Sequence, residues 1–91
     1  MSAKTLHPST AKIELDFPIQ ISGVEVKHFI MRRPKVRDDL AASKSSGSDE
    51  DKALMLVANL CEVTVDDLLD LDSSDWAKLE QQIQDFRQAR R

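Results

Sequence analysis

The sequence predicts an α+β fold, in which an N-terminal two-stranded antiparallel β-hairpin is followed by a small bundle of three to four α-helices. Three observations predict it. Apolar and polar residues alternate between residues 12 and 32, which is typical of half-buried strands. At Pro34 the alternation stops, and apolar residues then recur at helical spacing. Serine, threonine or aspartate precedes each later apolar run, where it can cap a helix.

The composition indicates one small soluble domain. The chain has 91 residues, of which 41% are apolar and 32% charged, so it resembles neither a disordered tail nor a membrane protein. Its longest apolar run, residues 53–58, is far too short to span a bilayer. The N-terminus lacks the apolar region of a signal peptide, so we expect a cytoplasmic protein. Residues 1–11 show no periodicity, and we expect a disordered tail followed by a single domain at residues 12–91.

The net charge of −3 is unevenly distributed along the chain. Residues 1–37 carry seven basic and three acidic residues, whereas residues 38–91 carry six basic and thirteen acidic residues. Complementary charge raises the rate of association more than the affinity, and an exposed ion pair contributes only about 0 to 1 kcal/mol. The asymmetry is therefore consistent with attraction within a molecule or between copies, but two ordinary solvated faces explain it better.

The hairpin is expected at about residues 12–32. Ser22-Gly23 makes a two-residue turn, with a glycine that tolerates positive φ. Pro18 cannot donate to a strand ladder, so its strand should lie at an edge or carry a bulge there. An uninterrupted register from the turn places every apolar side chain on one face. Its pairs are Ile21–Val24, Ile19–Val26, Phe17–His28 and Leu15–Ile30.

Helices are expected at about residues 34–44, 49–61, 65–71 and 73–89. Pro34 suits a first helical turn, because its φ is helical and the N–H that it lacks would be unpaired there. Val36 and Leu40 begin a short apolar stripe, and capping signals follow at Ser48, Thr64 and residues 72–75. Residues 53–61 are apolar apart from one asparagine, which predicts a central buried helix. The last helix has one apolar stripe, formed by Trp76, Leu79, Ile83 and Phe86.

No residue pattern predicts catalysis, a metal site or a cofactor. A nucleophile needs a base within hydrogen-bond reach, and we expect Cys61 and His28 to lie in the core rather than to form a thiol–imidazole pair. The acidic residues between 66 and 75 lack the glycine and glutamate of a calcium loop, and capping explains them better. Gly23 and Gly47, the only glycines, form no phosphate loop. We expect a non-enzymatic protein with no small-molecule substrate.

Nucleic-acid binding is the main alternative that the residues themselves suggest. The region around Pro34 carries a basic cluster with one interleaved aromatic residue, Phe29, on a hairpin that could act as a platform. The chain is acidic overall, and acidic residues stand close to the cluster, which argues against this alternative. The cluster comprises Lys27, His28, Arg32, Arg33, Lys35 and Arg37.

From about Phe17 to Phe86 the chain is similar to the tail assembly chaperones of Mu-like and related contractile-tailed bacteriophages. The order and spacing of four segments carry this resemblance. One position departs from the family pattern, because Glu62 stands where relatives often have glycine after the cysteine. The segments are Pro18-Ile19-Gln20-Ile21-Ser22-Gly23-Val24-Glu25-Val26, the hinge Met31-Arg32-Arg33-Pro34 with Arg37-Asp38, Leu56-Val57-Ala58-Asn59-Leu60-Cys61, and Asp66-Asp67-Leu68 with Leu71-Asp72.

The resemblance implies a non-enzymatic protein of the bacterial host cytoplasm that acts during virion assembly. Such a protein coats the long, largely helical tape-measure protein and presents it to polymerising tail-tube subunits. An apolar central helix beside an amphipathic last helix suits the burial of a client helix in a groove. The alternative is a small homo-oligomeric adaptor with another partner. We expect contacts with the client or with another copy at the hinge and the last helix, through Arg33, Pro34, Arg37, Leu79, Ile83, Phe86 and Arg87.

Overall fold

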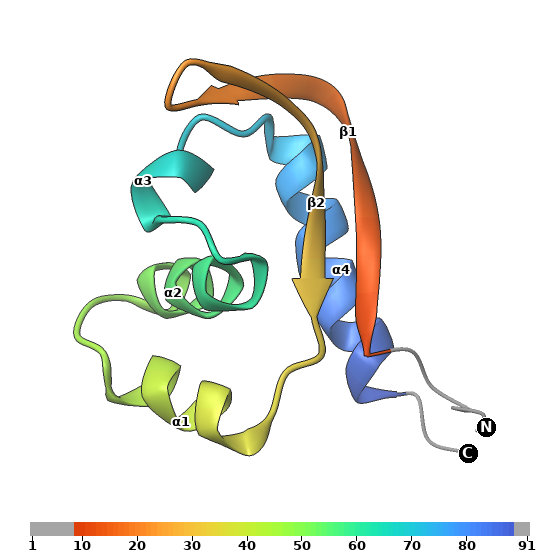
Figure 1. The fold of residues 1–91 in the computed structure, drawn as a ribbon. Coiled ribbons are helices and arrows are strands. Elements are labelled where there is room, and N and C mark those ends of the chain that lie inside the picture. The colour runs from red at the N-terminus through yellow and green to blue at the C-terminus, as the bar shows by residue number, and fades with distance from the viewer. Residues whose placement is uncertain (1–8, 89–91) are drawn as a thin grey trace, which may run out of the picture.

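The computed structural model describes residues 9–88 and has the predicted α+β fold. The two strands form an antiparallel hairpin, and the helices pack against it (Figure 1). Residues 1–8 of the predicted tail lie outside the described residues, whereas Thr10 and Ala11 belong to the first strand. That strand therefore begins two residues earlier than predicted. The elements are β1 (Thr10–Ile21), β2 (Val24–Arg32), α1 (Val36–Lys44), α2 (Asp49–Cys61), α3 (Val65–Leu68) and α4 (Ser73–Arg87).

The turn between the strands fixes the register of the residues next to it. Ser22 and Gly23 have φ values of 53° and 79°. Positive φ at both central residues gives a two-residue turn whose twist matches that of the flanking strands. Ile21 is paired with Val24 and Ile19 with Val26, as the sequence predicts.

A bulge in β1 changes the register beyond Ile19. The next pair is Glu14 with His28, so residues 15–18 of β1 stand opposite Lys27 alone. Pro18 lacks an N–H for the ladder, which is why the irregularity falls at this point of the strand. The predicted pairs Phe17–His28 and Leu15–Ile30 are wrong, although the expectation of an irregularity at Pro18 is confirmed.

The bulge also reverses which side chains of β2 face inward. Across the bulge β1 has three more residues than β2. Because side chains alternate between the two faces with a period of two, an odd number of extra residues places the other set of β2 side chains on the inner face. Phe29 and Met31 are consequently buried, whereas Ile30 is 49% exposed and His28 faces solvent. The prediction that His28 lies in the core is wrong for this reason.

Asp75, in the first turn of α4, accepts the backbone N–H groups that the bulge withdraws from the ladder. Its Oδ1 accepts the Asp16 N–H at 2.9 Å and its Oδ2 the Phe17 N–H at 3.0 Å. The Asp75 side chain is 0% exposed, and Lys78 Nζ lies 3.3 Å from Oδ1. Burial alone would raise the pKa of Asp75, but the two N–H groups and Lys78 outweigh burial and hold the pKa below its usual range. This buried carboxylate anchors β1 to α4.

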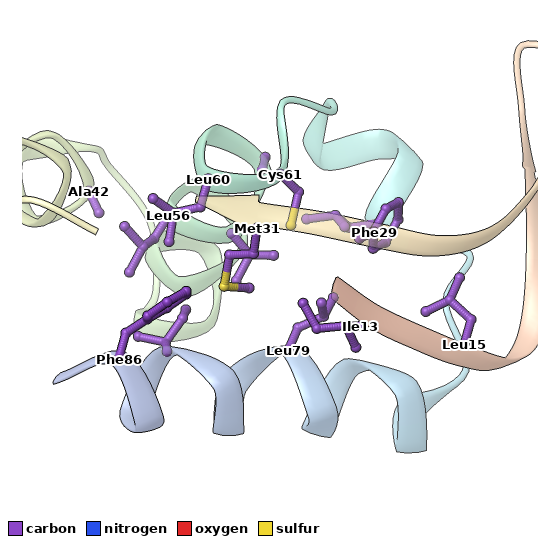
Figure 2. Packing of buried hydrophobic residues seen from close by; sticks show 14 of the residues in the cluster. Ile13, Leu15, Phe29, Met31, Ala42, Leu56, Leu60, Cys61, Leu79 and Phe86 are labelled. Atoms are coloured by element: carbon purple, nitrogen blue, oxygen red, sulfur yellow. The ribbon is translucent and has the colours of Figure 1, made fainter. Parts of the chain in front are cut away.

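The hydrophobic core lies between the inner face of the hairpin and helices α2 and α4. β2 contacts α2, and β1 contacts α4. Figure 2 shows Leu79 and Phe86 directed from α4 toward the side chains of the strands. The predicted burial of Cys61 is confirmed. In the predicted stripe of α4, Leu79, Ile83 and Phe86 are buried and Trp76 is half-buried.

Helix α1 begins two residues later than predicted and buries a different face. Lys35 is extended, with φ −114° and ψ 164°, and the helix starts at Val36. The buried residues of α1 are Asp38 and Ala42, whereas Val36 and Leu40 are 79% and 52% exposed. The predicted apolar stripe of α1 therefore faces solvent, because the side of the helix that carries Asp38 is buried, where Asp38 accepts hydrogen bonds from Arg32.

The chain between α2 and α4 turns more tightly than predicted. The Ser48 and Thr64 side chains accept N–H groups in the first turns of α2 and α3, as their capping positions indicate. Helix α3 stops at Leu68 rather than near residue 71, because the Leu69 and Leu71 N–H groups bond three residues back, to Asp66 and Leu68.

Glu62 ends α2 in the left-handed region, with φ 60° and ψ 45°. The next N–H, of Val63, donates to the Ala58 carbonyl at 3.0 Å, which closes the helix end. Glycine most readily takes this conformation, so Glu62 bears the strain of a side chain in the left-handed region.

We expect Asp75→Asn to lower the free energy of unfolding by on the order of 2 to 4 kcal/mol. An amide offers one oxygen to two N–H donors and turns its own NH₂ toward one of them. Urea unfolding followed by circular dichroism measures the change. Asp70→Asn, an exposed acid ahead of α4, is the matched control and should change stability by less than about 0.5 kcal/mol. Equal losses in both variants would contradict the anchoring role of Asp75.

We expect Glu62→Gly to raise the melting temperature. Relief of the left-handed strain, about 1 to 2 kcal/mol, exceeds the extra unfolded-state entropy of glycine, leaving a gain of about 0.5 to 1 kcal/mol. Glu62→Ala removes the same carboxylate but keeps a Cβ atom, and it should not stabilise the protein. Equal gains in the two variants would assign the effect to the charge of Glu62, which acts on Arg32, rather than to the backbone.

Candidate functional site

The hinge between β2 and α1 is fastened to the C-terminal end of α4. Arg33 Nη2 donates to the Phe86 carbonyl at 3.0 Å, and the Arg33 guanidinium lies 5.1 Å from the centroid of the Phe86 ring. A cation over an aromatic face contributes roughly 0.5 to 1 kcal/mol at a partly exposed site. Two residues that the sequence analysis selected separately thus form one contact.

A second cluster, which the sequence analysis missed, holds the start of α1. Arg32 donates to both carboxylate oxygens of Asp38, with Nη1–Oδ2 and Nη2–Oδ1 distances of 2.9 Å. The Lys35 N–H donates to Asp38 Oδ2 at 2.8 Å. The Arg32 hydrogen bonds outweigh burial and, with the Lys35 N–H, lower the pKa of Asp38 from 3.8 to about 2. An acid three residues after a helix-capping position is the signal that could have revealed this cluster.

Arg87 joins the same corner of the molecule through Asp39. Its Nη2 lies 2.6 Å from Asp39 Oδ1, and both side chains are substantially exposed. An exposed pair of this kind adds little stability. The structure therefore brings Arg33, Phe86 and Arg87 together at one end of α4, beside the hinge.

The apolar members of the predicted site are covered by the chain itself. Leu79, Ile83 and Phe86 are 0%, 5% and 4% exposed. A partner could meet their side chains only if α4 separated from the hairpin, so partner contact by these residues stays a prediction. Pro34 is half-buried, and Arg37 is exposed on α1.

Cys61 and His28 line one groove of about 480 Å³ beside β2, but they do not form an activated pair. Burial raises the pKa of the Cys61 thiol to about 12, so the sulfur is protonated at neutral pH. Among residues 9–88 no hydrogen bond joins the two side chains, and no group of three or more His, Cys, Asp and Glu side chains could hold a metal ion. No helix in the same part of the chain is long and apolar enough to cross a membrane.

A basic groove of about 520 Å³ lies beside the hinge. It is lined by Ser9, Thr10, Arg32, Arg33, Lys35 and Arg37. Arg32 and Arg33 already bind Asp38 and Phe86, which leaves Lys35 and Arg37 as the cations that point to solvent. Phe29, the aromatic residue of the predicted nucleic-acid platform, is buried in the core and cannot stack on a base.

Comparison with known families decides the identity of the chain. Residues 12–88 match the family model described as phage tail assembly chaperone proteins, E, or 41 or 14. The chain is a member of the phage tail assembly chaperone family. The match spans β1 from Lys12 onward, β2, the hinge and helices α1 to α4. The resemblance identified from the sequence is thereby confirmed. No curated protein and no solved structure gives a significant match.

An apolar pocket of about 190 Å³ opens on this chaperone where α2, α3 and α4 meet. It is called the three-helix pocket below. The sequence pattern does not predict this pocket, because it places Leu69 and Leu71 within a longer helix, whereas the early end of α3 places them in the pocket wall. Its charged residues are both acidic. The lining includes Leu54, Leu69, Leu71 and Trp76, with Glu50 and Glu80.

We expect Asp38→Asn to destabilise the chaperone at neutral pH and to weaken its acid dependence. The folded-state pKa of Asp38, about 2, lies below the ordinary 3.8, so the carboxylate stabilises the fold above about pH 4. That contribution is lost as the pH falls through about 2. Thermal melts of wild type and variant between about pH 7 and pH 2 should converge at the acid end. Glu25→Gln, at an exposed strand position, is the control, and a constant difference between wild type and Asp38→Asn at every pH would contradict the role of the Asp38 charge.

Proposed function

We propose that this chaperone binds the tape-measure protein, keeps it from aggregating, and presents it to tail-tube subunits in the bacterial cytoplasm without catalysing a reaction. The match of residues 12–88 to the tail assembly chaperone family carries the proposal. A tape-measure protein is long and largely helical, and its apolar faces stay uncovered until the tube forms around it. A helix with an uncovered apolar face needs a partner that buries that face.

The surface of the chaperone supports a binding role. Phe17, Val36, Leu40 and Leu69 each expose about half or more of their surface. Leu69 belongs to the three-helix pocket, which has the concave apolar form that accepts side chains of an amphipathic helix. Contiguous exposed apolar surface, such as that of Val36 and Leu40 one turn apart on α1, is typical of interaction sites.

The chemistry of the described residues also favours binding over catalysis. The thiol of Cys61 is buried and protonated, so it lacks the thiolate that a cysteine nucleophile requires. The two buried carboxylates, Asp38 and Asp75, are bonded to Arg32 and to the β1 backbone, where they stabilise the fold. Cys61 shares a groove with His28, but within residues 9–88 no hydrogen bond joins the two side chains.

An adaptor that binds a polyanion remains the second candidate function, and the basic groove is the observation that favours it. Two of its four cations, Arg32 and Arg33, already bind Asp38 and the Phe86 carbonyl. Lys35 and Arg37 are left to bind phosphate groups, which limits the number that the groove can neutralise. Charged contacts of this small number give weak, salt-sensitive binding without sequence preference.

Co-expression with the tape-measure protein encoded nearby tests the proposed function. We expect the client to be retained on the tagged chaperone and to aggregate in its absence, because its apolar faces would then have no partner. The fraction of soluble client, measured with and without the chaperone, gives the result. Ovalbumin expressed from the same vector in place of the chaperone controls for synthesis load. A client that is equally soluble in both cultures and is not retained would refute the proposal.

A further inference from the structure

Helix α1 presents an apolar face, with two basic side chains beside it, that the rest of residues 9–88 leaves uncovered. The acid on the other side of this face, Asp39, is paired with Arg87. Val36 and Leu40 are one turn apart on this face and are 79% and 52% exposed. At 100° per residue, Arg37 and Lys44 flank them on one side, while Asp38 and Ala42 lie on the opposite, buried side. Within residues 9–88, neither Arg37 nor Lys44 has an ion-pair partner.

The three-helix pocket has the complementary character. Its apolar wall includes Leu54, Leu69 and Trp76, and its charged residues, Glu50 and Glu80, are both exposed acids. Neither acid has an ion pair within the described part of the chain. A cavity of about 150 Å³ accommodates a benzene ring, so the volume of about 190 Å³ suits aliphatic side chains such as Val36 and Leu40.

We propose that a second copy of this chain fills the three-helix pocket with its α1 helix. Val36 and Leu40 of the second copy insert into the pocket and contact its apolar wall, while Arg37 and Lys44 of that copy approach Glu50 and Glu80. The α1 helix of the same copy cannot do this, because it packs on α2 through its Asp38 and Ala42 side and turns Val36 and Leu40 away from the protein. Charge complementarity between the two surfaces selects a second copy over an acidic or uncharged partner.

The geometry of this contact determines how copies assemble. Two different surfaces meet, so each copy keeps one free pocket and one free α1 helix, and further copies can add until a ring closes or an open chain grows. A single helix in a pocket buries less than the roughly 1,200 to 2,000 Å² of a stable interface. Each contact is therefore weak, and assembly depends on protein concentration. This inference goes beyond client binding and does not rest on it.

A charge exchange tests the contact. Arg37→Glu places an acid opposite Glu80, and Glu80→Arg places a base opposite Arg37, so each variant alone should associate about tenfold or more weakly than wild type. Mixed in equal amounts, the variants restore both contacts, since the altered helix fits the altered pocket and the natural helix fits the natural pocket. We expect the mixture, but neither variant alone, to regain the mass that wild type shows in sedimentation velocity.

Trp76 gives a second readout at the pocket itself. It is the only tryptophan of the chain and is half-buried in the pocket wall. Insertion of a second copy removes water from the ring, so its emission should shift to shorter wavelength as concentration rises in wild type and in the mixture. Glu80 is the better acid to exchange, because Glu50 lies in the first turn of α2, where an arginine would oppose the helix dipole.

The controls carry the same charge changes away from both surfaces. Lys27→Glu and Glu25→Arg lie on the exposed side of β2, and they should associate as wild type does. Far-ultraviolet circular dichroism establishes that every variant is folded. A wild type that remains monomeric up to about 1 mM, or single variants that associate as tightly as wild type, would overturn the proposal. Loss in both single variants without recovery in the mixture would overturn it too, because the two surfaces would then have other occupants.

Discussion

The carboxylate of Asp75 is the interaction on which the rest of this fold depends. A strand that contains Pro18 cannot keep a continuous ladder, and the bulge that results leaves the N–H groups of Asp16 and Phe17 without partners on β2. Unpaired buried N–H groups are costly. Asp75 accepts both, and it comes from the first turn of α4, where the helix dipole also favours a negative charge. The bulge and the position of α4 therefore depend on each other, because the same two hydrogen bonds stabilise both.

The opposite end of α4 is held by a different chemistry. There the guanidinium of Arg33 binds the Phe86 carbonyl and lies over its ring, while Arg32 and Asp38 fix the start of α1 close by. Polar anchors thus fasten α4 to the hairpin and its hinge at both ends, and the apolar core lies between them (Figure 2). A small domain buries a limited share of its surface. Directional contacts at the two ends of one helix add orientation that a small core would not supply by packing alone.

The same arrangement decides which surfaces a tail assembly chaperone can offer to partners. Burial of Asp38 turns Val36 and Leu40 outward, and the early end of α3 opens the apolar pocket beside α2 and α4. On α4, by contrast, the stripe residues Leu79, Ile83 and Phe86 are buried in the core. Exposed apolar side chains therefore lie on α1, at Val36 and Leu40, and directly after α3, at Leu69.

Local patterns in the sequence determined the fold class, the hairpin turn at Ser22-Gly23, the pairs next to it and the capping of α2 and α3, because each depends on residues only a few positions apart. Family membership followed from the order of such segments. The tertiary structure decided the inward face of β2, the exposed face of α1 and the corner that joins Arg33 to Phe86. In each case a distant group sets the outcome: Asp75 accepts N–H groups from a strand 58 and 59 residues away, Arg32 draws Asp38 inward, and the Phe86 carbonyl binds an arginine 53 residues away. Periodicity places side chains relative to their neighbours along the chain, but only long-range packing determines which polar group finds a partner that offsets the cost of its burial.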